Sequence, residues 1–274
     1  MLTVHTLYAM DPPSAKLLDT SGIRSNFHIG GAFQDGEIRL TYTHYDRMIV
    51  GGVVPNGATL VLDEVKECGT ASFLDRREVG ILNIGDTGSV AAMGQTWQLK
   101  KEEVLYLPKG AGPISFAGQG RFYLMSAPAH HAFEAVHLSS ADANQVKLGA
   151  QETSNDRTIF QFIHPDGVQS CQLVMGLTKL HNGSVWNTMP AHLHDRRMEA
   201  YLYYDLSADQ RVLHLMGQPE ETRHIIMANE DIAISPPWSI HAGAGTGSYT
   251  FCWAMAGDNM AFTDMDPVPM DLLK

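Results

Sequence analysis

The organising feature of the chain is PAHLHDRRME at residues 190–199, which is completed by SPPWSIH at residues 235–241. Side chains two residues apart on an extended strand point to the same face, so His192 and His194 can face one ion. The step of five residues to Glu199 breaks this alternation and predicts a tight turn onto a neighbouring strand. His241 must then arrive from a third strand, which an antiparallel barrel permits.

Three imidazoles and one carboxylate, from His192, His194, Glu199 and His241, form a donor set for a divalent metal ion. Neutral imidazole and carboxylate suit Zn, Fe, Mn, Co or Ni, and the absence of a cysteine argues against a closed structural zinc site. An ion with room for substrate oxygens acts as a Lewis acid and can stabilise an enediolate. The alternative is that the four are separate polar residues of the surface or the core.

Short apolar runs between Gly, Pro, Asn and Asp recur through the chain and predict an all-β fold of barrel or sandwich type. A polar run at residues 139–155 is typical of a connection between domains. We therefore expect an N-terminal extension and a first barrel in residues 1–138, a linker in 139–155, and a metal-binding barrel in 156–274. Residues 1 to about 40 form the extension, with a short helix near Ser14.

An internal repeat supports two tandem barrels. FLDRREVGIL at residues 73–82 resembles LHDRRMEAYL at residues 193–202. Ser72, Leu74 and Pro113 then stand where the second copy has its three histidines, so the first barrel is expected to be degenerate and free of metal. Glu78 lies one residue out of register with Glu199, and a salt bridge to Arg76 or Arg77 would explain it.

A reaction that moves a proton between adjacent carbons also needs a general base. Glu199 could serve, and Glu220 and His224 are further catalytic candidates, as are Glu221 and His214. Arg197 shares the strand parity of Glu199, so we expect it to bind a substrate carboxylate, with Arg223 as second choice. Pairing of Arg197 with an acid at the barrel edge is the alternative.

Composition excludes several classes of function. The formal net charge of −11 argues against binding to nucleic acid or to an anionic membrane. The first residues lack the pattern of a secretion signal, and no apolar stretch is long enough to span a bilayer. Three cysteines without a CxxC pair fit a reducing compartment, so a cytoplasmic protein is expected.

These ligands resemble the two motifs of the cupins, although Trp238 replaces a motif glycine and no glycine follows Glu199 at the usual spacing. More specifically, the whole chain resembles the 5-keto-4-deoxyuronate isomerase family, also called the 4-deoxy-L-threo-5-hexosulose-uronate ketol-isomerases. The strings that carry this resemblance are LDT (18–20), HYDRMIVGG (44–52), FLDRRE (73–78), WNTMP (186–190), MGQP (216–219), ETRH (221–224) and SP-WSIH within 235–241.

The resemblance implies a bicupin of two jelly-roll barrels with one zinc ion per chain, held by His192, His194, Glu199 and His241, and a homohexameric assembly. It implies an intramolecular oxidoreductase of bacterial pectin and uronate degradation. The reaction would be the aldose–ketose conversion of 5-dehydro-4-deoxy-D-glucuronate to 3-deoxy-D-glycero-2,5-hexodiulosonate through a metal-stabilised enediolate. The alternatives are a 5-deoxyglucuronate isomerase of inositol catabolism, an Fe(II) cupin dioxygenase, and a non-catalytic sugar-acid binder or regulator.

Overall fold

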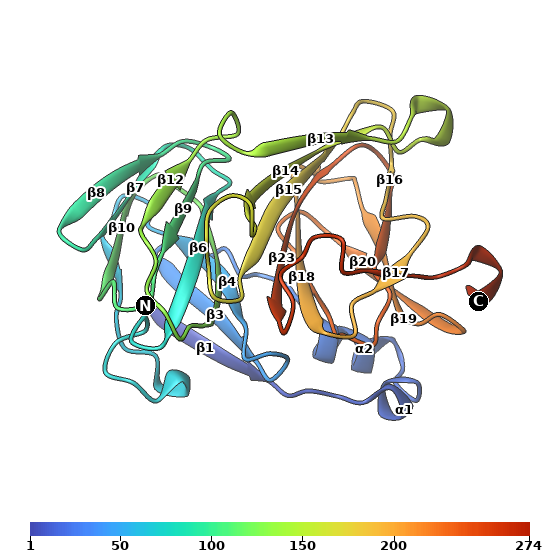
Figure 1. Ribbon diagram of the computed structural model, residues 1–274, viewed down its shortest axis with the longest axis horizontal. Helices are drawn as coiled ribbons and strands as arrows, with labels where there is room; N and C mark the ends of the chain where they lie inside the picture. The colour runs from blue at the N-terminus through green and yellow to red at the C-terminus, as the bar shows by residue number, and fades with distance from the viewer. The chain divides into compact units, whose positions relative to one another are not determined.

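The computed structural model describes residues 1–274 and consists mostly of β-strands (Figure 1). The chain divides into two compact units. The first unit comprises residues 1–7, 31–143 and 162–174, and the second comprises residues 8–30, 144–161 and 175–274. No helix is long and apolar enough to cross a membrane.

Two sheets carry the first unit. The larger has the order β1-β3-β4-β11-β6-β9-β12, and the smaller has the order β5-β10-β7-β8. Apolar side chains of both, among them Val79, Leu105 and Phe116, form one buried cluster. The strands are β1 (Leu2–Leu7), β3 (Glu37–Thr43), β4 (Ile49–Val54), β5 (Leu60–Leu62), β6 (Arg77–Asn83), β7 (Gly88–Ala92), β8 (Gln95–Leu99), β9 (Val104–Leu107), β10 (Ile114–Gly118), β11 (Phe122–Pro128) and β12 (Val136–Leu138), with the 3-10 helix η1 (Lys66–Cys68).

The second unit repeats this plan. Its larger sheet has the order β13-β14-β15-β23-β18-β21-β2, and its smaller sheet has the order β16-β22-β19-β20, with β17 and β24 forming a separate pair. The strands are β2 (His28–Ile29), β13 (Asn144–Leu148), β14 (Arg157–Ile163), β15 (Val174–Leu180), β16 (Trp186–Asn187), β17 (His192–Leu193), β18 (Arg197–Tyr204), β19 (Val212–Gln218), β20 (Glu221–Met227), β21 (Ile232–Ser235), β22 (Ala242–Gly245), β23 (Thr250–Gly257) and β24 (Asp266–Pro267). The helices are α1 (Pro12–Ala15), α2 (Thr20–Phe27), η2 (Gln151–Thr153) and η3 (Met270–Leu272).

The matching strand orders confirm the two tandem all-β barrels expected from the sequence. Central strands β6 and β18 correspond, and each begins at the last arginine of its Asp-Arg-Arg motif. Val79 and Glu199 are therefore the equivalent third residues of the two strands. That the first barrel binds no metal stays a prediction, with Ser72, Leu74 and Pro113 at the positions aligned with the histidines.

Glu78 makes different contacts from the expected salt bridge. Strand side chains alternate, so Glu78 points away from the face that carries Val79. Its buried carboxylate accepts hydrogen bonds from the Tyr106 hydroxyl at 2.8 Å and from the backbone N–H groups of Cys171, Gln172 and Leu173 at 2.7–2.9 Å. Four donors satisfy the buried carboxylate without a basic partner.

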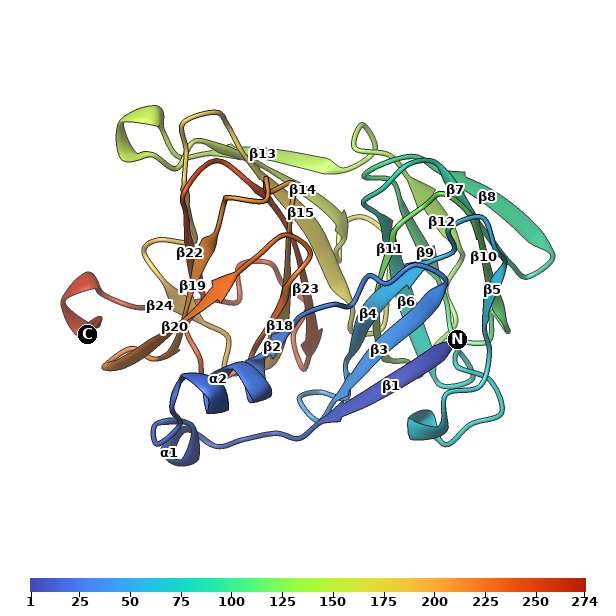
Figure 2. The same ribbon diagram turned by 180° about the vertical axis from the view of Figure 1, so that it is seen from behind.

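The terminal extension and the linker are more ordered than the sequence suggested. Strand β1 pairs in parallel with β3, and β13 pairs with β14 inside the residues expected to form a linker. Residues 8–30 belong to the second unit, where β2 pairs with β21 and α2 lies beside β20 (Figure 2). Polar composition at residues 144–148 misled because the side chains of the edge strand β13 are mostly exposed while its backbone groups still find partners in β14.

Helix α2 was not anticipated. Its N-cap is Asp19, whose side chain accepts a hydrogen bond from the backbone N–H of Gly22 at 2.7 Å. Ile23 and Phe27 are buried. The ring of Phe27 meets the ring of Trp238 edge-on, with centroids 6.0 Å apart, and the Trp238 indole donates to the carbonyl of Met10 at 3.1 Å. The segment before the first barrel thus supports the loop that leads to His241.

Candidate metal centre

Three separate segments position the four predicted ligands, all in the second unit. His192 begins the short strand β17 and His194 follows it directly. A turn at Asp195 and Arg196 then leads into β18, as the five-residue step predicted. Glu199 lies on β18, opposite Ser235 of β21 and Met255 of β23. His241 comes from the loop that directly precedes β22.

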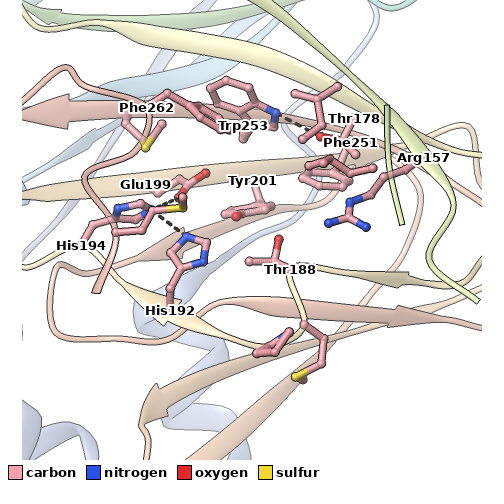
Figure 3. A pocket seen from close by; sticks show the side chains of 16 residues that line it. Arg157, Thr178, Thr188, His192, His194, Glu199, Tyr201, Phe251, Trp253 and Phe262 are labelled. Atoms are coloured by element: carbon pink, nitrogen blue, oxygen red, sulfur yellow. Dashed lines mark hydrogen bonds and ion pairs between the residues drawn. The ribbon is translucent and has the colours of Figure 1, made fainter. Parts of the chain in front are cut away.

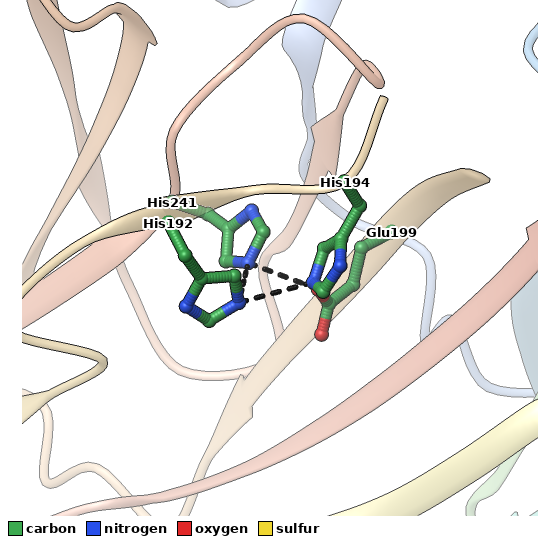
Figure 4. Close-up of side chains that lie close together, drawn as sticks. All are labelled: His192, His194, Glu199 and His241. Carbon is green, nitrogen blue, oxygen red and sulfur yellow. Dashed lines mark hydrogen bonds and ion pairs between the residues drawn. The ribbon is translucent and has the colours of Figure 1, made fainter. Parts of the chain in front are cut away.

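The four side chains converge on one point (Figure 4). The Nε2 atom of His192 lies 3.0 Å from the Nε2 atoms of both His194 and His241. The Oε2 atom of Glu199 lies 3.1 Å from the same two nitrogens of His194 and His241. Donor atoms bound to one ion at 2.0–2.1 Å are separated by about 3 Å. The spacing therefore fits a single metal ion at the centre of the cluster.

The hydrogen bonding of Glu199 also indicates that the cluster binds a cation. Glu199 Oε2 is buried and has no hydrogen-bond donor in the protein. A buried carboxylate oxygen without a partner is strongly unfavourable, and a cation between it and the three imidazoles removes that penalty. His194, Glu199 and His241 are each at most 4% exposed. The residues thus fit a divalent cation.

Hydrogen bonds behind the ligands fix the ring orientations. His194 Nδ1 lies 2.8 Å from the carbonyl oxygen of Asp264, and His241 Nδ1 lies 3.2 Å from the Ser235 hydroxyl oxygen. Because a carbonyl can only accept, His194 Nδ1 must carry the proton, which leaves the Nε2 lone pair facing the cluster. Burial, followed by the charge of His194, lowers the pKa of His192 to about 4, and burial lowers the pKa of His241 well below its ordinary value. Both rings are therefore in the neutral, metal-binding form near pH 7.

A cavity of about 250 Å³ opens beside this cluster (Figure 3). His192, His194 and Glu199 line one part of it, and Arg157 lines another. Tyr201 and Thr188 lie between them in the close-up view. The remaining lining residues are Thr178 and the apolar Leu148, Ile159, Met189, Pro190, Phe251, Trp253, Met255, Phe262 and Met265.

Tyr201 lies between the two polar parts of the cavity wall, beside Thr188. Burial, followed by the charge of Glu199, raises the pKa of its hydroxyl well above the ordinary value. Thr188 itself has a φ of 54°, which is uncommon for a β-branched residue, and its Oγ1 accepts from Asn187 Nδ2 at 3.0 Å. Strained backbone of this kind is often found where a site must hold a side chain in place.

Arg197 does not line the cavity. Its side chain is buried, and Nη1 donates to the carbonyls of Asn259 and Ala261 at 3.0 and 2.9 Å, while Nη2 donates to the carbonyl of Asp264 at 3.1 Å. Arg197 has the same strand parity as Glu199, as expected, but its guanidinium binds backbone carbonyls of a loop and does not face the cavity. Arg197 therefore holds the same Asp264 carbonyl that orients His194.

The other candidate residues lie on the hairpin of β19 and β20, away from the cavity lining. Glu220 and His224 are exposed, and Arg223 forms an ion pair with Glu221 at 2.6 Å. His214 is buried, with Nδ1 2.8 Å from the Tyr203 hydroxyl, and burial lowers its pKa to about 3. Of the sequence-based candidates for the general base, Glu199 is the one that lines the cavity.

Sequence reasoning missed Arg157, Thr188 and Tyr201 as parts of a site. Tyr201 has the parity of Glu199 on β18, but a tyrosine at such a position is as typical of barrel packing as of a site. Arg157 is the first residue of β14 and stands in a polar stretch without a motif. No pattern in the local sequence separates such an arginine from a solvated one.

Known proteins resemble the chain along its whole length. A 4-deoxy-L-threo-5-hexosulose-uronate ketol-isomerase of Cereibacter sphaeroides is 62% identical over 274 residues, covering 100% of both chains. The protein of the same name from Agrobacterium fabrum is 60% identical, covering 99% of this chain and 100% of its own. Among solved structures, an IolB-like protein of Salmonella typhimurium shares the fold with a TM-score of 0.67 and 16% identity, over 81% of this chain and 86% of its own. The KduI/IolB family matches residues 29–268, and the chain belongs to that family.

Proposed function

We propose that this protein is a ketol-isomerase that converts 5-dehydro-4-deoxy-D-glucuronate to 3-deoxy-D-glycero-2,5-hexodiulosonate. The observation that carries the proposal is the cluster of His192, His194, Glu199 and His241 at the wall of a cavity of about 250 Å³. This space accepts a molecule of the size of a six-carbon sugar acid. Relatives that are 60–62% identical over the whole chain bear the name of the enzyme for this substrate, which supports the choice.

The reaction shifts a carbonyl between adjacent carbons. A proton leaves C2 and one is delivered to C1, while the C1 aldehyde becomes an alcohol and the C2 alcohol becomes a ketone. A divalent cation held by the four ligands would supply Lewis-acid stabilisation of the negative charge that develops on the substrate oxygens. Glu199 lines the cavity and is the candidate to carry the proton between the two carbons. The neutral Tyr201 hydroxyl lines the same cavity, where the charge of Glu199 acts on it.

The apolar wall has a separate task. Phe251, Trp253 and Phe262 line the cavity and limit the water that can reach it. Excluding water strengthens each electrostatic interaction with the substrate and protects a reactive enediolate from side reactions. The Trp253 indole is fixed by a hydrogen bond to the Thr178 hydroxyl at 3.1 Å. The position of the Trp253 side chain in the wall is therefore fixed by a hydrogen bond as well as by packing.

A substrate comparison tests the proposal against its nearest rival. Purified protein is incubated with the open-chain 4-deoxy-5-keto uronate and, separately, with 5-deoxyglucuronate, and the products are followed by NMR. We expect turnover of the first compound and at most slow turnover of the second. Preference for 5-deoxyglucuronate would assign the protein to inositol catabolism, and substrate-dependent oxygen uptake would identify a dioxygenase. Absence of turnover with retained uronate binding would indicate a sugar-acid binder.

Three further properties belong to the same proposal. We propose zinc as the resident ion, because the donor set suits it and the family resemblance implies it. A homohexamer follows from the same resemblance and is tested by sedimentation. The location is proposed to be cytoplasmic, which agrees with three free thiols at Cys68, Cys171 and Cys252.

A further inference from the structure

We propose that Arg157 forms the carboxylate-binding subsite of the cavity and thereby selects sugar acids over neutral sugars. The inference rests on the proposed function, which supplies the class of substrate. Arg157 begins β14 and lines the same cavity as His192, His194 and Glu199. Arg157 lies outside the sequence motifs that contain the four candidate metal ligands.

The guanidinium of Arg157 has unused hydrogen-bonding capacity. Its Nη1 donates to the carbonyl oxygen of Asn155 at 2.8 Å, and neither Nε nor Nη2 has a protein partner. No carboxylate forms an ion pair with it. An arginine that is partly withdrawn from water normally pairs with an acid. Donors that face a cavity without such a partner are suited to an anionic ligand, which they can bind at two oxygens.

The charge distribution supports the same assignment. Arg157 is the one lysine or arginine among the residues that line the cavity. The protein carries a formal net charge of −11, so its long-range field repels an anion. A bound carboxylate must therefore be stabilised locally. Besides the metal ligands, the remaining polar side chains of the lining, Thr178, Thr188 and Tyr201, are neutral hydroxyl groups that carry no compensating positive charge.

The arrangement of the strands matches the two ends of the substrate. The sheet order β14-β15-β23-β18 separates the strand of Arg157 from the strand of Glu199 by two others. Adjacent strands lie about 4.8 Å apart, so the two backbones are separated by roughly 14 Å, and the long side chains reach inward from both. Figure 3 shows Arg157 and the histidines apart, with Tyr201 and Phe251 between them.

A linear uronate likewise has its reacting group at one end and its charged group at the other. Its reacting carbons C1 and C2 lie at one end of a six-carbon chain, and its carboxylate is C6 at the other end. With C1 and C2 beside Glu199, the carboxylate extends past Tyr201 toward the free Nε and Nη2 donors of Arg157. The subsite would therefore select both the charge and the length of the substrate. Arg197, which the sequence favoured for this role, is occupied by loop carbonyls.

Steady-state kinetics of Arg157→Met test the proposal. The guanidinium contacts C6 in the ground state and in the transition state alike, so its loss should raise KM and leave kcat within a few-fold. We expect KM for the uronate to rise roughly 10- to 100-fold, the ratio associated with a charge-assisted hydrogen-bonded pair. Arg157→Lys retains the charge without the planar fork and should show a smaller rise. Melting temperature and metal content verify that each variant is folded and loaded.

Arg211→Met is the matched control. Arg211 is an exposed arginine of the same unit that also donates to backbone carbonyls, those of Ala208 and Gln210, and it does not line the cavity. We expect its KM to equal that of the wild type. An unchanged KM in folded, metal-loaded Arg157→Met would overturn the proposal, as would an equal rise of KM in both variants.

A binding measurement separates this inference from the proposed function. L-Gulonate is a linear six-carbon acid that lacks the reacting aldehyde, and D-glucitol is its neutral counterpart. Calorimetry of the metal-loaded protein should show tighter binding of L-gulonate, and Arg157→Met should abolish that preference. If the wild type fails to isomerise the uronate but shows this Arg157-dependent preference, the proposed function fails and the subsite stands. A preference that survives in Arg157→Met contradicts the subsite, whatever the enzyme turns over.

Discussion

Replacing Arg197 with methionine should loosen the loop that orients a metal ligand. The guanidinium donates to the carbonyls of Asn259, Ala261 and Asp264, and the last of these also accepts from His194 Nδ1. Hydrogen bonds from a charged donor contribute about 1.5–3 kcal/mol each, and removing a buried charge recovers part of that sum, so we expect a net loss of about 3 kcal/mol. For a chain of this size the melting temperature should fall by about 6–12 °C.

The assay compares stability, metal affinity and KM in one set of variants. Loss of support behind a metal-bound histidine typically lowers metal affinity about 10- to 100-fold, which a competition titration with a chromophoric chelator measures. Arg211→Met is the control, because Arg211 is exposed and donates to the backbone carbonyls of Ala208 and Gln210, which do not contact His194. A raised KM for the uronate in Arg197→Met, with melting temperature and metal affinity unchanged, would refute the positional role and restore the substrate clamp.

Three other perturbations have defined outcomes. Glu78→Gln places an amide against three backbone N–H donors, so chemical denaturation should show a loss of about 2–4 kcal/mol; metal affinity should not change, and a weakened metal site would contradict this purely structural role. The pKa of His214 is near 3 in the folded protein and 6.5 in the unfolded chain, so the unfolded chain binds more protons between these pH values. The free energy of unfolding therefore declines as the pH is lowered through this range, and His214→Gln should make that decline shallower by about 1.4 kcal/mol per pH unit. An unaltered slope would exclude a contribution of His214 to the acid sensitivity. Trp238→Phe removes the bond to Met10 and should raise the metal Kd several-fold, whereas unchanged binding would show that residues 8–30 do not support His241.

The fold and the cluster of four candidate ligands could be predicted from residues that carry their own pattern. The alternation of His192 and His194, the five-residue step to Glu199 and the Asp-Arg-Arg repeat each depend on local backbone geometry. The structure brings the four ligand atoms together and repeats the strand order of one barrel in the other. Local backbone geometry was sufficient to predict these features, because each of the two barrels carries the Asp-Arg-Arg motif at the start of the same central strand.

The direction of a long side chain at the start of a strand could not be predicted. Arg197 and Arg157 both begin strands, yet the first binds loop carbonyls and the second lines the cavity. The alternation of side chains along a strand indicates the face of the sheet on which a residue lies. It does not indicate that carbonyls within residues 258–264, which are distant in sequence, accept hydrogen bonds from Arg197. Glu220 and His224 are exposed on the hairpin of β19 and β20 and do not line the cavity, which their local sequence did not indicate.

The domain ranges show the same limit. Residues 8–30 precede the first barrel in sequence but pack with the second unit, where Phe27 meets Trp238. Such pairing depends on contacts between residues more than 200 positions apart. The sequence pattern of a short helix and a two-residue strand contains no information about its partner.

Metal-dependent turnover of the uronate tests the central claim most directly. Protein stripped by a chelator, with metal loss verified by mass spectrometry, is incubated with 5-dehydro-4-deoxy-D-glucuronate before and after addition of zinc, beside His192→Ala. We predict that isomerisation stops in the stripped protein, returns with zinc, and does not return in His192→Ala while the melting curve still shows a folded chain. Full turnover by the metal-free protein would contradict the account.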